Sequence, residues 1–250
     1  MFKNQSGKLF LKIAIGFAIV VVFLALIFFW AERGNSHSTS KFIDEAAELK
    51  KNNEAAIANM SAGEVLSVRA ADKNDYYWGD LKAKVQLIVY LDYDCPFCLE
   101  YYATLKKVRQ AFGDKVAIVF RHYPLDSHPN APLAAQAFEC ARAQGQAEAM
   151  AEKLLTNQKT NNNNQSGLLK AAAELGLKQE EFKTCWQDKA VAEAILTVKN
   201  EAKSFGVMGT PTSFLNGRNL PGAFKFEDFS DQTGRSYDGL KTLIQKELEK

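Results

Sequence analysis

The sequence is poor in cysteine and proline, and it lacks internal repeats and any dense run of basic residues. Four cysteines and six prolines in 250 residues exclude a disulfide-dense scaffold and a collagen-like chain, and a hydrophobic share of 47% excludes a wholly disordered one. Once Lys3, Lys8 and Lys12 are set aside, 28 of the 31 basic side chains remain against 29 acidic ones. Nucleic-acid-binding proteins carry a clustered excess of basic side chains, and this part of the chain has none, so we expect no nucleic-acid partner.

A long apolar run stands near the N-terminus. Residues 13–31 (IAIGFAIVVVFLALIFFWA) carry no charge and are interrupted only by Gly16. As a helix, the run matches the thickness of a hydrocarbon core and has no polar face, which favours a transmembrane helix over a buried core helix. No small-x-small cleavage site or nearby cysteine follows it. We therefore expect an uncleaved signal-anchor; the alternative is a cleaved signal peptide and a soluble secreted protein.

The charges around this run predict its orientation. The three lysines named above precede it, whereas Glu32 and Arg33 cancel each other after it. The positive-inside rule then places residues 1–12 in the cytoplasm as a short tail and the rest of the chain outside. The working domain is thus expected in an oxidising compartment, where an even number of cysteines indicates disulfide chemistry.

Residues 32–71 are predicted to be a linker with a stalk. The stretch GNSHSTSK is small and polar, as in a flexible spacer. Phe42, Ala46 and Leu49 then begin an apolar pattern at helical spacing. This pattern predicts an amphipathic stalk helix or a segment through which two copies associate.

From residue 72 the apolar pattern predicts a β-α-β unit. Residues 85–91 (VQLIVYL) form a nearly continuous β-prone run, as in a central strand covered on both faces. A Cys-Pro-Phe-Cys motif follows at once, a helical stretch then ends near Gly113, and residues 116–120 form a second apolar strand. The motif is therefore expected at a strand-to-helix junction.

The remainder predicts a helical insertion followed by two strands and a closing helix. Residues 130–205 carry almost only helical periodicity, interrupted at Asn161–Asn164, which we expect in an exposed turn. Asn216-Gly217 is a strong hairpin signal between two short strands. The fold class is thus α/β, with one domain formed by residues 72–129 and 206–250.

Cys95-Pro96-Phe97-Cys98 is the strongest chemical signal in the chain. Cys95 would meet the positive end of the helix dipole and unpaired N–H groups, which lower the pKa of a thiol. A stabilised thiolate is a good leaving group and makes the disulfide oxidising. Cys98, one turn further on, is the shielded resolving thiol in this interpretation, and Pro96 fits the first turn because its missing N–H would be unpaired there.

Two other interpretations of the motif are an inert structural disulfide and half of a zinc site. Zinc needs two more ligands, and the sequence has no second Cys-x-x-Cys motif. The nearby candidates are His122 and His128. We expect both histidines to be strand-end and loop residues, although His122 could lie near enough to favour a thiolate.

Four segments of the chain form a pattern that is highly specific, because a Cys-x-x-Cys motif is combined with a distant Gly-Thr-Pro-Thr and with helices between them. The segments are Asp92–Cys98, Phe120–Leu125, His128-Pro129 and Gly206–Thr212. Over residues 75–250 the chain resembles the DsbA-like branch of the thioredoxin superfamily. The resemblance implies a thioredoxin-like fold with a helical insertion, here preceded by the predicted transmembrane helix, and a redox-active Cys95–Cys98 disulfide with no other cofactor.

The resemblance also assigns roles to Thr210 and Pro211. It implies that Pro211 is preceded by a cis peptide bond and lies beside the Cys-x-x-Cys motif, and that Thr210 helps to orient a bound peptide. The residues alone predict only a turn, because cis is the minority state of X–Pro bonds. Thr at this position is compatible with oxidases, isomerases and reductases, so it does not decide the direction of electron flow.

The sequence departs from many such relatives at one buried strand position. Where they carry an acidic residue six positions before the first cysteine, this chain has Val89. Asp92 is the nearest acidic alternative, although strand alternation could point it elsewhere. Proton transfer to Cys98 is the step that this departure affects.

Cys140 and Cys185 both fall on predicted helices of the insertion. They are either two separate buried thiols, which pack as small hydrophobic groups, or a structural disulfide that ties two helices together. The second interpretation resembles a second bridge found in some relatives. Such a bridge would stabilise the fold by roughly 3–4 kcal/mol in the chain-entropy model.

Five aromatic residues near the motifs have two interpretations. They either line an apolar peptide groove or pack in the core. They are Tyr93, Phe97, Tyr101, Tyr102 and Phe214.

The sequence thus predicts a thiol–disulfide oxidoreductase on the periplasmic side of a bacterial inner membrane, the bacterium being implied by the resemblance alone. We expect it to introduce disulfides into exported proteins that carry cysteine thiols. The resemblance implies that a DsbB-like, quinone-linked membrane partner reoxidises it. The alternatives are a reductase or isomerase served by a membrane electron donor, and a redox-inert peptide-binding chaperone.

Overall fold

The computed structural model describes residues 68–231 and 233–250. The predicted anchor at residues 13–31 and the predicted stalk lie outside these residues. Among the helices of the described part, none is long and apolar enough to cross a membrane.

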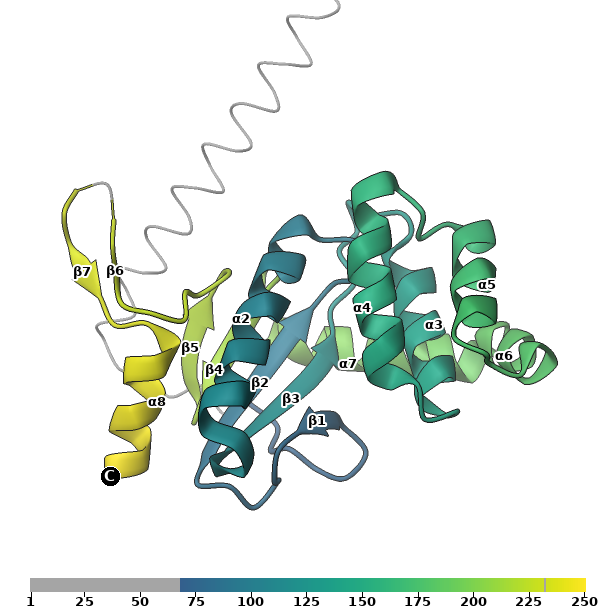
Figure 1. Cartoon of the computed structure of the whole chain (residues 1–250). Coiled ribbons are helices and arrows are strands. Elements are labelled where there is room, and N and C mark those ends of the chain that lie inside the picture. The colour runs from purple at the N-terminus through teal and green to yellow at the C-terminus, as the bar shows by residue number, and fades with distance from the viewer. Residues whose placement is uncertain (1–67, 232) are drawn as a thin grey trace, which may run out of the picture. The chain divides into compact units, whose positions relative to one another are not determined.

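A five-stranded mixed sheet forms the centre of the domain (Figure 1), in the order β1-β3-β2-β4-β5. β2 and β3 run parallel, and the other neighbouring pairs are antiparallel. The strands are β1 (Tyr76–Trp78), β2 (Val85–Leu91), β3 (Val116–His122), β4 (Thr212–Leu215) and β5 (Arg218–Pro221).

The apolar run of β2 is covered on both faces, which confirms the prediction of a central strand. Val85, Leu87 and Val89 belong to the larger core cluster, together with residues of α2 (Pro96–Phe112) and α8 (Leu240–Glu249). The intervening Ile88 and Tyr90 belong to a second cluster with residues of α7 (Lys189–Ser204). Because side chains alternate along a strand, α2 and α8 lie on one side of the sheet and α7 on the other (Figure 1).

Five helices run consecutively between β3 and β4, and four of them gather beside the sheet (Figure 1). Besides α7, they are α3 (Ala131–Arg142), α4 (Ala147–Asn157), α5 (Gln165–Glu174) and α6 (Gln179–Trp186). Short 3-10 turns, η2 (Gly113–Lys115) and η3 (Gln158–Thr160), follow α2 and α4. The predicted helical character of this stretch is confirmed.

The tight turn between β4 and β5 confirms the hairpin predicted at Asn216-Gly217. Both residues have positive φ, 46° and 85°, as a two-residue hairpin turn with two left-handed positions requires. The sequence did not predict β1 or the small hairpin of β6 (Phe229–Ser230) and β7 (Ser236–Tyr237). Strands of two or three residues are too short to show a periodic pattern.

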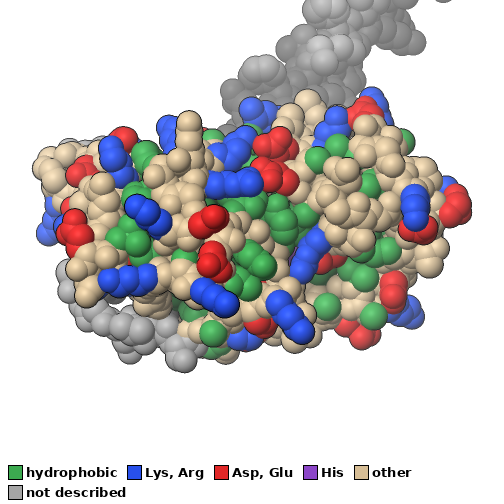
Figure 2. All heavy atoms as spheres, turned by 60° about the horizontal axis from the view of Figure 1, so that its bottom comes forward, with side chains coloured by type: hydrophobic (Ala, Val, Ile, Leu, Met, Phe, Trp, Pro, Cys, Tyr) green, Lys and Arg blue, Asp and Glu red, His purple; other side chains and the backbone are tan. Residues whose placement is uncertain are grey.

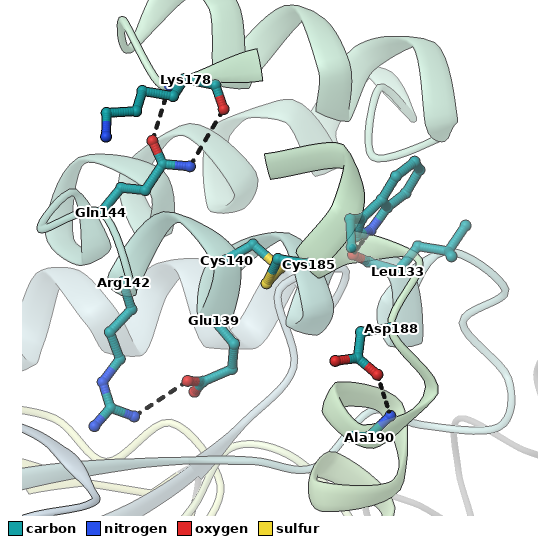
Figure 3. The surroundings of a disulfide bond; sticks show 10 residues. Leu133, Glu139, Cys140, Arg142, Gln144, Lys178, Cys185, Asp188 and Ala190 are labelled. Carbon is teal, nitrogen blue, oxygen red and sulfur yellow. Dashed lines mark hydrogen bonds and ion pairs between the residues drawn. A yellow bond between two sulfur atoms is a disulfide. The ribbon is translucent and has the colours of Figure 1, made fainter. Parts of the chain in front are cut away.

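A disulfide joins Cys140 on α3 to Cys185 near the end of α6 (Figure 3). The two residues are 45 positions apart in the chain, so the closed loop contributes about 4 kcal/mol in the chain-entropy model. Next to Cys185, the Trp186 indole N–H donates to the Leu133 carbonyl at 3.0 Å. These contacts fasten α6 to α3 from two successive positions.

The molecular surface in Figure 2 mixes acidic and basic side chains around hydrophobic areas. Neither sign dominates this face. It therefore carries no extended basic area of the kind that follows a nucleic-acid backbone.

Candidate redox site

The Cys-Pro-Phe-Cys motif lies where β2 leads into α2. Cys95 is the N-cap of α2, with an extended backbone, and Pro96 stands at the start of the helix. The amide N–H groups of Cys98 and Leu99 donate to the Cys95 carbonyl at 3.1 and 3.4 Å. Proline suits this position because its fixed φ matches the helix and its missing N–H leaves no donor unpaired.

The environment of Cys95 stabilises its thiolate. A hydrogen bond from the Cys98 thiol is the largest cause, and it outweighs the opposing effect of burial. Hydrogen bonds from the backbone N–H groups of Cys98 and Phe97 act in the same direction. Together they lower the pKa of Cys95 from 9.0 to about 6. Because neutral pH lies above this pKa, most Cys95 side chains are thiolates at neutral pH.

Cys98 has the opposite character. It is buried, and burial raises the pKa of its thiol well above the ordinary value. Its neighbour Cys95 raises that pKa further, because two thiolates cannot be accommodated side by side. The backbone N–H of Asp92 donates to the Cys98 sulfur at 3.4 Å. Both cysteines are free thiols in this structure, so it describes the reduced form.

The pairing of β4 with β2 brings a second segment to the motif. Thr212 pairs with Tyr90, so the residues before β4 lie beside those that follow β2. The Thr210–Pro211 peptide bond in this segment is cis. The Cys95 sulfur lies 3.4 Å from the Thr210 carbonyl oxygen, which accepts a hydrogen bond from it when Cys95 is protonated. The Thr210 hydroxyl is buried and has no hydrogen-bond partner among the described residues.

Val89 and Asp92, the two positions compared above for proton transfer, lie in different environments. Val89 is fully buried among apolar residues. The buried Asp92 carboxylate accepts hydrogen bonds from the N–H groups of Leu125 and Asp94 and pairs with the His128 ring at 2.8, 2.7 and 2.9 Å. Burial nevertheless raises its pKa. Asp92 thus reaches Cys98 through its backbone N–H, while its carboxylate ties the motif to the loop after β3.

Both candidate histidines pair with carboxylates. The Nε2 atom of His122 lies 2.7 Å from Glu139 of α3. Its ring also packs against Phe138 and Tyr93. His128 contacts Asp92, as described above. These pairings support their interpretation as strand-end and loop residues.

Four of the five aromatic candidates pack in the core. Tyr93, Tyr101, Tyr102 and Phe214 are each no more than 3% exposed. Only Phe97, which is 59% exposed, offers an apolar surface at the motif. The sequence did not single out Met208, which is 86% exposed and precedes Thr210 by two residues.

Asn163 corrects the prediction that Asn161–Asn164 form an exposed turn. Its side chain is fully buried, and its Nδ2 atom lies near three acceptors. These are the Tyr93 carbonyl at 3.3 Å, the Asp94 carboxylate at 2.9 Å and the Leu154 carbonyl at 3.0 Å. Asn163 therefore fastens the residues just before Cys95 to the helical insertion. A run of four polar residues hides this role, because only one of them faces inward.

The loop that carries Asn163 is closed against the start of α5. A Cβ atom at Gly167 would lie 1.8 Å from the Asn162 carbonyl oxygen, so only glycine allows this approach. Asn164 caps the helix by accepting from the Gly167 N–H at 3.1 Å. Both contacts hold Asn163 in its inward position.

The fold and the site together define a thioredoxin-fold domain with a Cys-x-x-Cys pair beside a cis-proline and with helices inserted between β3 and β4. The described residues contain no cluster of three or more His, Cys, Asp or Glu side chains that could hold a metal ion. A family model described as Thioredoxin matches residues 71–233. The chain belongs to the thioredoxin family.

Known structures and curated proteins share parts of this chain. Alpha-DsbA1 of Wolbachia pipientis superposes with a TM-score of 0.58 at 23% identity, covering 74% of this chain and 96% of that one. BdbD of Bacillus subtilis superposes with a TM-score of 0.58 at 20% identity, covering 75% and 100%. At these identities the similarity shows the fold.

Among curated proteins, the Na(+)/H(+) antiporter NhaA 1 of Mycobacterium sp. (strain KMS) is 36% identical over 162 residues, or 62% of this chain and 26% of the antiporter. NhaA of Herminiimonas arsenicoxydans is 33% identical over 168 residues, or 67% and 26%. The chain thus spans about a quarter of the length of the curated relatives it matches.

The pKa of Cys95 predicts how its reactivity depends on pH. In the reduced protein, alkylation of Cys95 by iodoacetamide should rise about tenfold per pH unit below pH 6 and level off above it, because only the thiolate reacts. Cys98→Ala should move this midpoint upward, since it removes the largest stabilising hydrogen bond. Mass spectrometry of the alkylated peptides separates the two cysteines. A wild-type midpoint near 9 would contradict the described environment.

The buried position of Asn163 predicts a cost for its removal. Asn163→Ala should lower the free energy of unfolding by about 2 kcal/mol, because it leaves buried acceptors without a donor. Asn162→Ala, at an exposed neighbour, should change it by less than about 0.5 kcal/mol. Chemical denaturation of both variants measures the difference. Equal effects of the two substitutions would refute the inward role of Asn163.

Proposed function

We propose that this protein is a DsbA-like thiol–disulfide oxidoreductase that donates the Cys95–Cys98 disulfide to exported proteins. The observation that carries this proposal is the opposite environment of the two thiols. Cys95 has its pKa lowered to about 6, whereas burial raises that of Cys98. A stabilised Cys95 thiolate favours the reduced form of the pair, and a pair that favours its reduced form oxidises other thiols.

The first step is attack of a substrate thiolate on the Cys95 sulfur. The Cys95–Cys98 bond breaks, a mixed disulfide between substrate and Cys95 forms, and Cys98 leaves with the electron pair. The Asp92 N–H, 3.4 Å from the Cys98 sulfur, stabilises the charge that develops there. Because the pKa of Cys98 is raised, this sulfur then takes up a proton from solvent.

The second step releases the product. A second substrate thiolate attacks the substrate sulfur of the mixed disulfide, and Cys95 leaves as a thiolate. Its lowered pKa makes it a good leaving group. In total the substrate loses two electrons and two protons and gains a disulfide, while the enzyme pair is reduced. The Thr210 carbonyl, next to the Cys95 sulfur, is a backbone acceptor at which the substrate chain can align.

The location and partners form the second part of the proposal. We infer that residues 13–31 anchor the chain in an inner membrane with the domain outside, on the charge argument given above. The Cys140–Cys185 disulfide supports an oxidising compartment, since such bonds are rare where thiols are kept reduced. A DsbB-like, quinone-linked membrane oxidase would accept the two electrons and restore the Cys95–Cys98 disulfide.

Trapping of intermediates tests this function. In cells that produce Cys98→Ser, mixed disulfides between Cys95 and exported proteins should accumulate. The reason is that the Cys98 thiol, which otherwise attacks the Cys95 sulfur and releases the substrate, is absent. Non-reducing electrophoresis followed by mass spectrometry identifies them. The matched control is Cys95→Ser combined with Cys98→Ser, which should trap none. If the single variant traps no more than the double variant, the proposed function is wrong.

A further inference from the structure

A cavity of about 390 Å³ lies beside the redox site and takes no part in the steps above. Its walls come from the loop after β3, the last turns of α7 and the segment before the cis-proline. The side chains used below are those of Leu125, Asp126, Lys199, Lys203 and Met208.

Two walls of this cavity connect to the residues around the cysteine pair, one through hydrogen bonds and one along the chain. The Leu125 N–H donates to Asp92, whose own N–H donates to the Cys98 sulfur. On the other side, Met208 precedes Thr210 by two residues, a span of at most about 7 Å. The Thr210 carbonyl oxygen lies 3.4 Å from the Cys95 sulfur. The cavity wall at Met208 is therefore within two residues of the carbonyl beside Cys95.

Lys199 is the unusual group in this cavity. Its side chain is only 7% exposed, yet its one charged partner among the described residues is Asp126, at 2.6 Å, whose side chain is 86% exposed. An ammonium group has three N–H donors, and a buried one needs a negatively charged neighbour. Here the neighbour is a surface carboxylate, so a carboxylate that enters the cavity can take its place beside Lys199.

The balance of charge in the cavity favours an acidic ligand. Lys199 and the exposed Lys203 supply two positive charges against the single negative charge of Asp126. Leu125 and Met208 add apolar surface, which suits the methylene groups of an acidic side chain. An acidic side chain is thus matched in charge and in its apolar stem.

We propose that this cavity is a subsite for an acidic side chain of the substrate, located within a few residues of the cysteine that attacks Cys95. Lys199 is the specificity-determining residue, and Asp126 is an internal occupant that the substrate carboxylate displaces. The inference names a substrate preference for the proposed function and rests on that function.

The test compares three synthetic dithiol peptides that differ at one residue, three positions from the first cysteine, which is Glu, Gln or Lys. The oxidised full-length chain is mixed with each peptide, and the second-order rate of peptide oxidation is measured by acid quench and chromatography. Each rate is divided by that of the same peptide with bis(2-hydroxyethyl) disulfide, an uncharged reagent, which cancels the effect of the neighbouring charge on the reactivity of the peptide thiol. The Glu peptide should be oxidised about three- to tenfold faster than the Lys peptide.

Two substitutions should change the ratio of the Glu-peptide rate to the Lys-peptide rate in opposite directions. Lys199→Met keeps the length and apolar stem of the side chain but removes the charge, so the ratio should fall to near one. Asp126→Asn removes the internal competitor, so the ratio should rise above that of the wild type. Lys170→Met, at a position on α5 that is 77% exposed, is the matched control and should leave it unchanged.

The outcomes separate this inference from the function on which it rests. Equal normalised rates for all three peptides, or a ratio that Asp126→Asn does not raise, would overturn the subsite while leaving the oxidase function intact. Failure of the wild type to oxidise any peptide would overturn the proposed function itself. Asp126→Asn keeps the test decisive if Lys199→Met fails to fold, because residue 126 lies at the surface.

Discussion

The antiparallel pairing of β4 with β2 is the constraint on which the redox site depends. Tyr90 lies opposite Thr212, so the segment that follows β2 and the segment that precedes β4 meet at the same end of the two strands. One segment carries Cys95 and the other carries Thr210, more than a hundred positions later in the chain. A shift of this register by one residue would turn the side chains of β4 to the opposite face and move the Thr210 carbonyl away from the thiol.

The helical insertion contributes to the site as well as to the fold. Asn163 fastens the turn before Cys95, and Glu139 pairs with His122 at the end of β3. The disulfide holds α3, which carries Glu139, to α6 (Figure 3). The insertion thus supports the residues around the motif through contacts separate from those of the cis-proline segment.

Much of the fold could be predicted from local patterns. The continuous apolar run of β2, the glycine that ends α2 and the Asn-Gly turn each act through short-range physics that a sequence displays. Asn163 and Lys199 could not be found in this way. Both are polar residues in polar or amphipathic stretches, and only tertiary packing buries them. The strands of two or three residues were missed because pairing with a neighbour, rather than periodicity, defines them.

We propose that the Cys95–Cys98 disulfide is a strong oxidant because its reduced form is stabilised at Cys95. The most direct measurement is its reduction potential, obtained by equilibrating the full-length chain with glutathione redox buffers. We expect a reduction potential between about −120 and −180 mV, the range of disulfide donors. A value near about −270 mV, typical of a reductant, or a disulfide that glutathione cannot open, would contradict it.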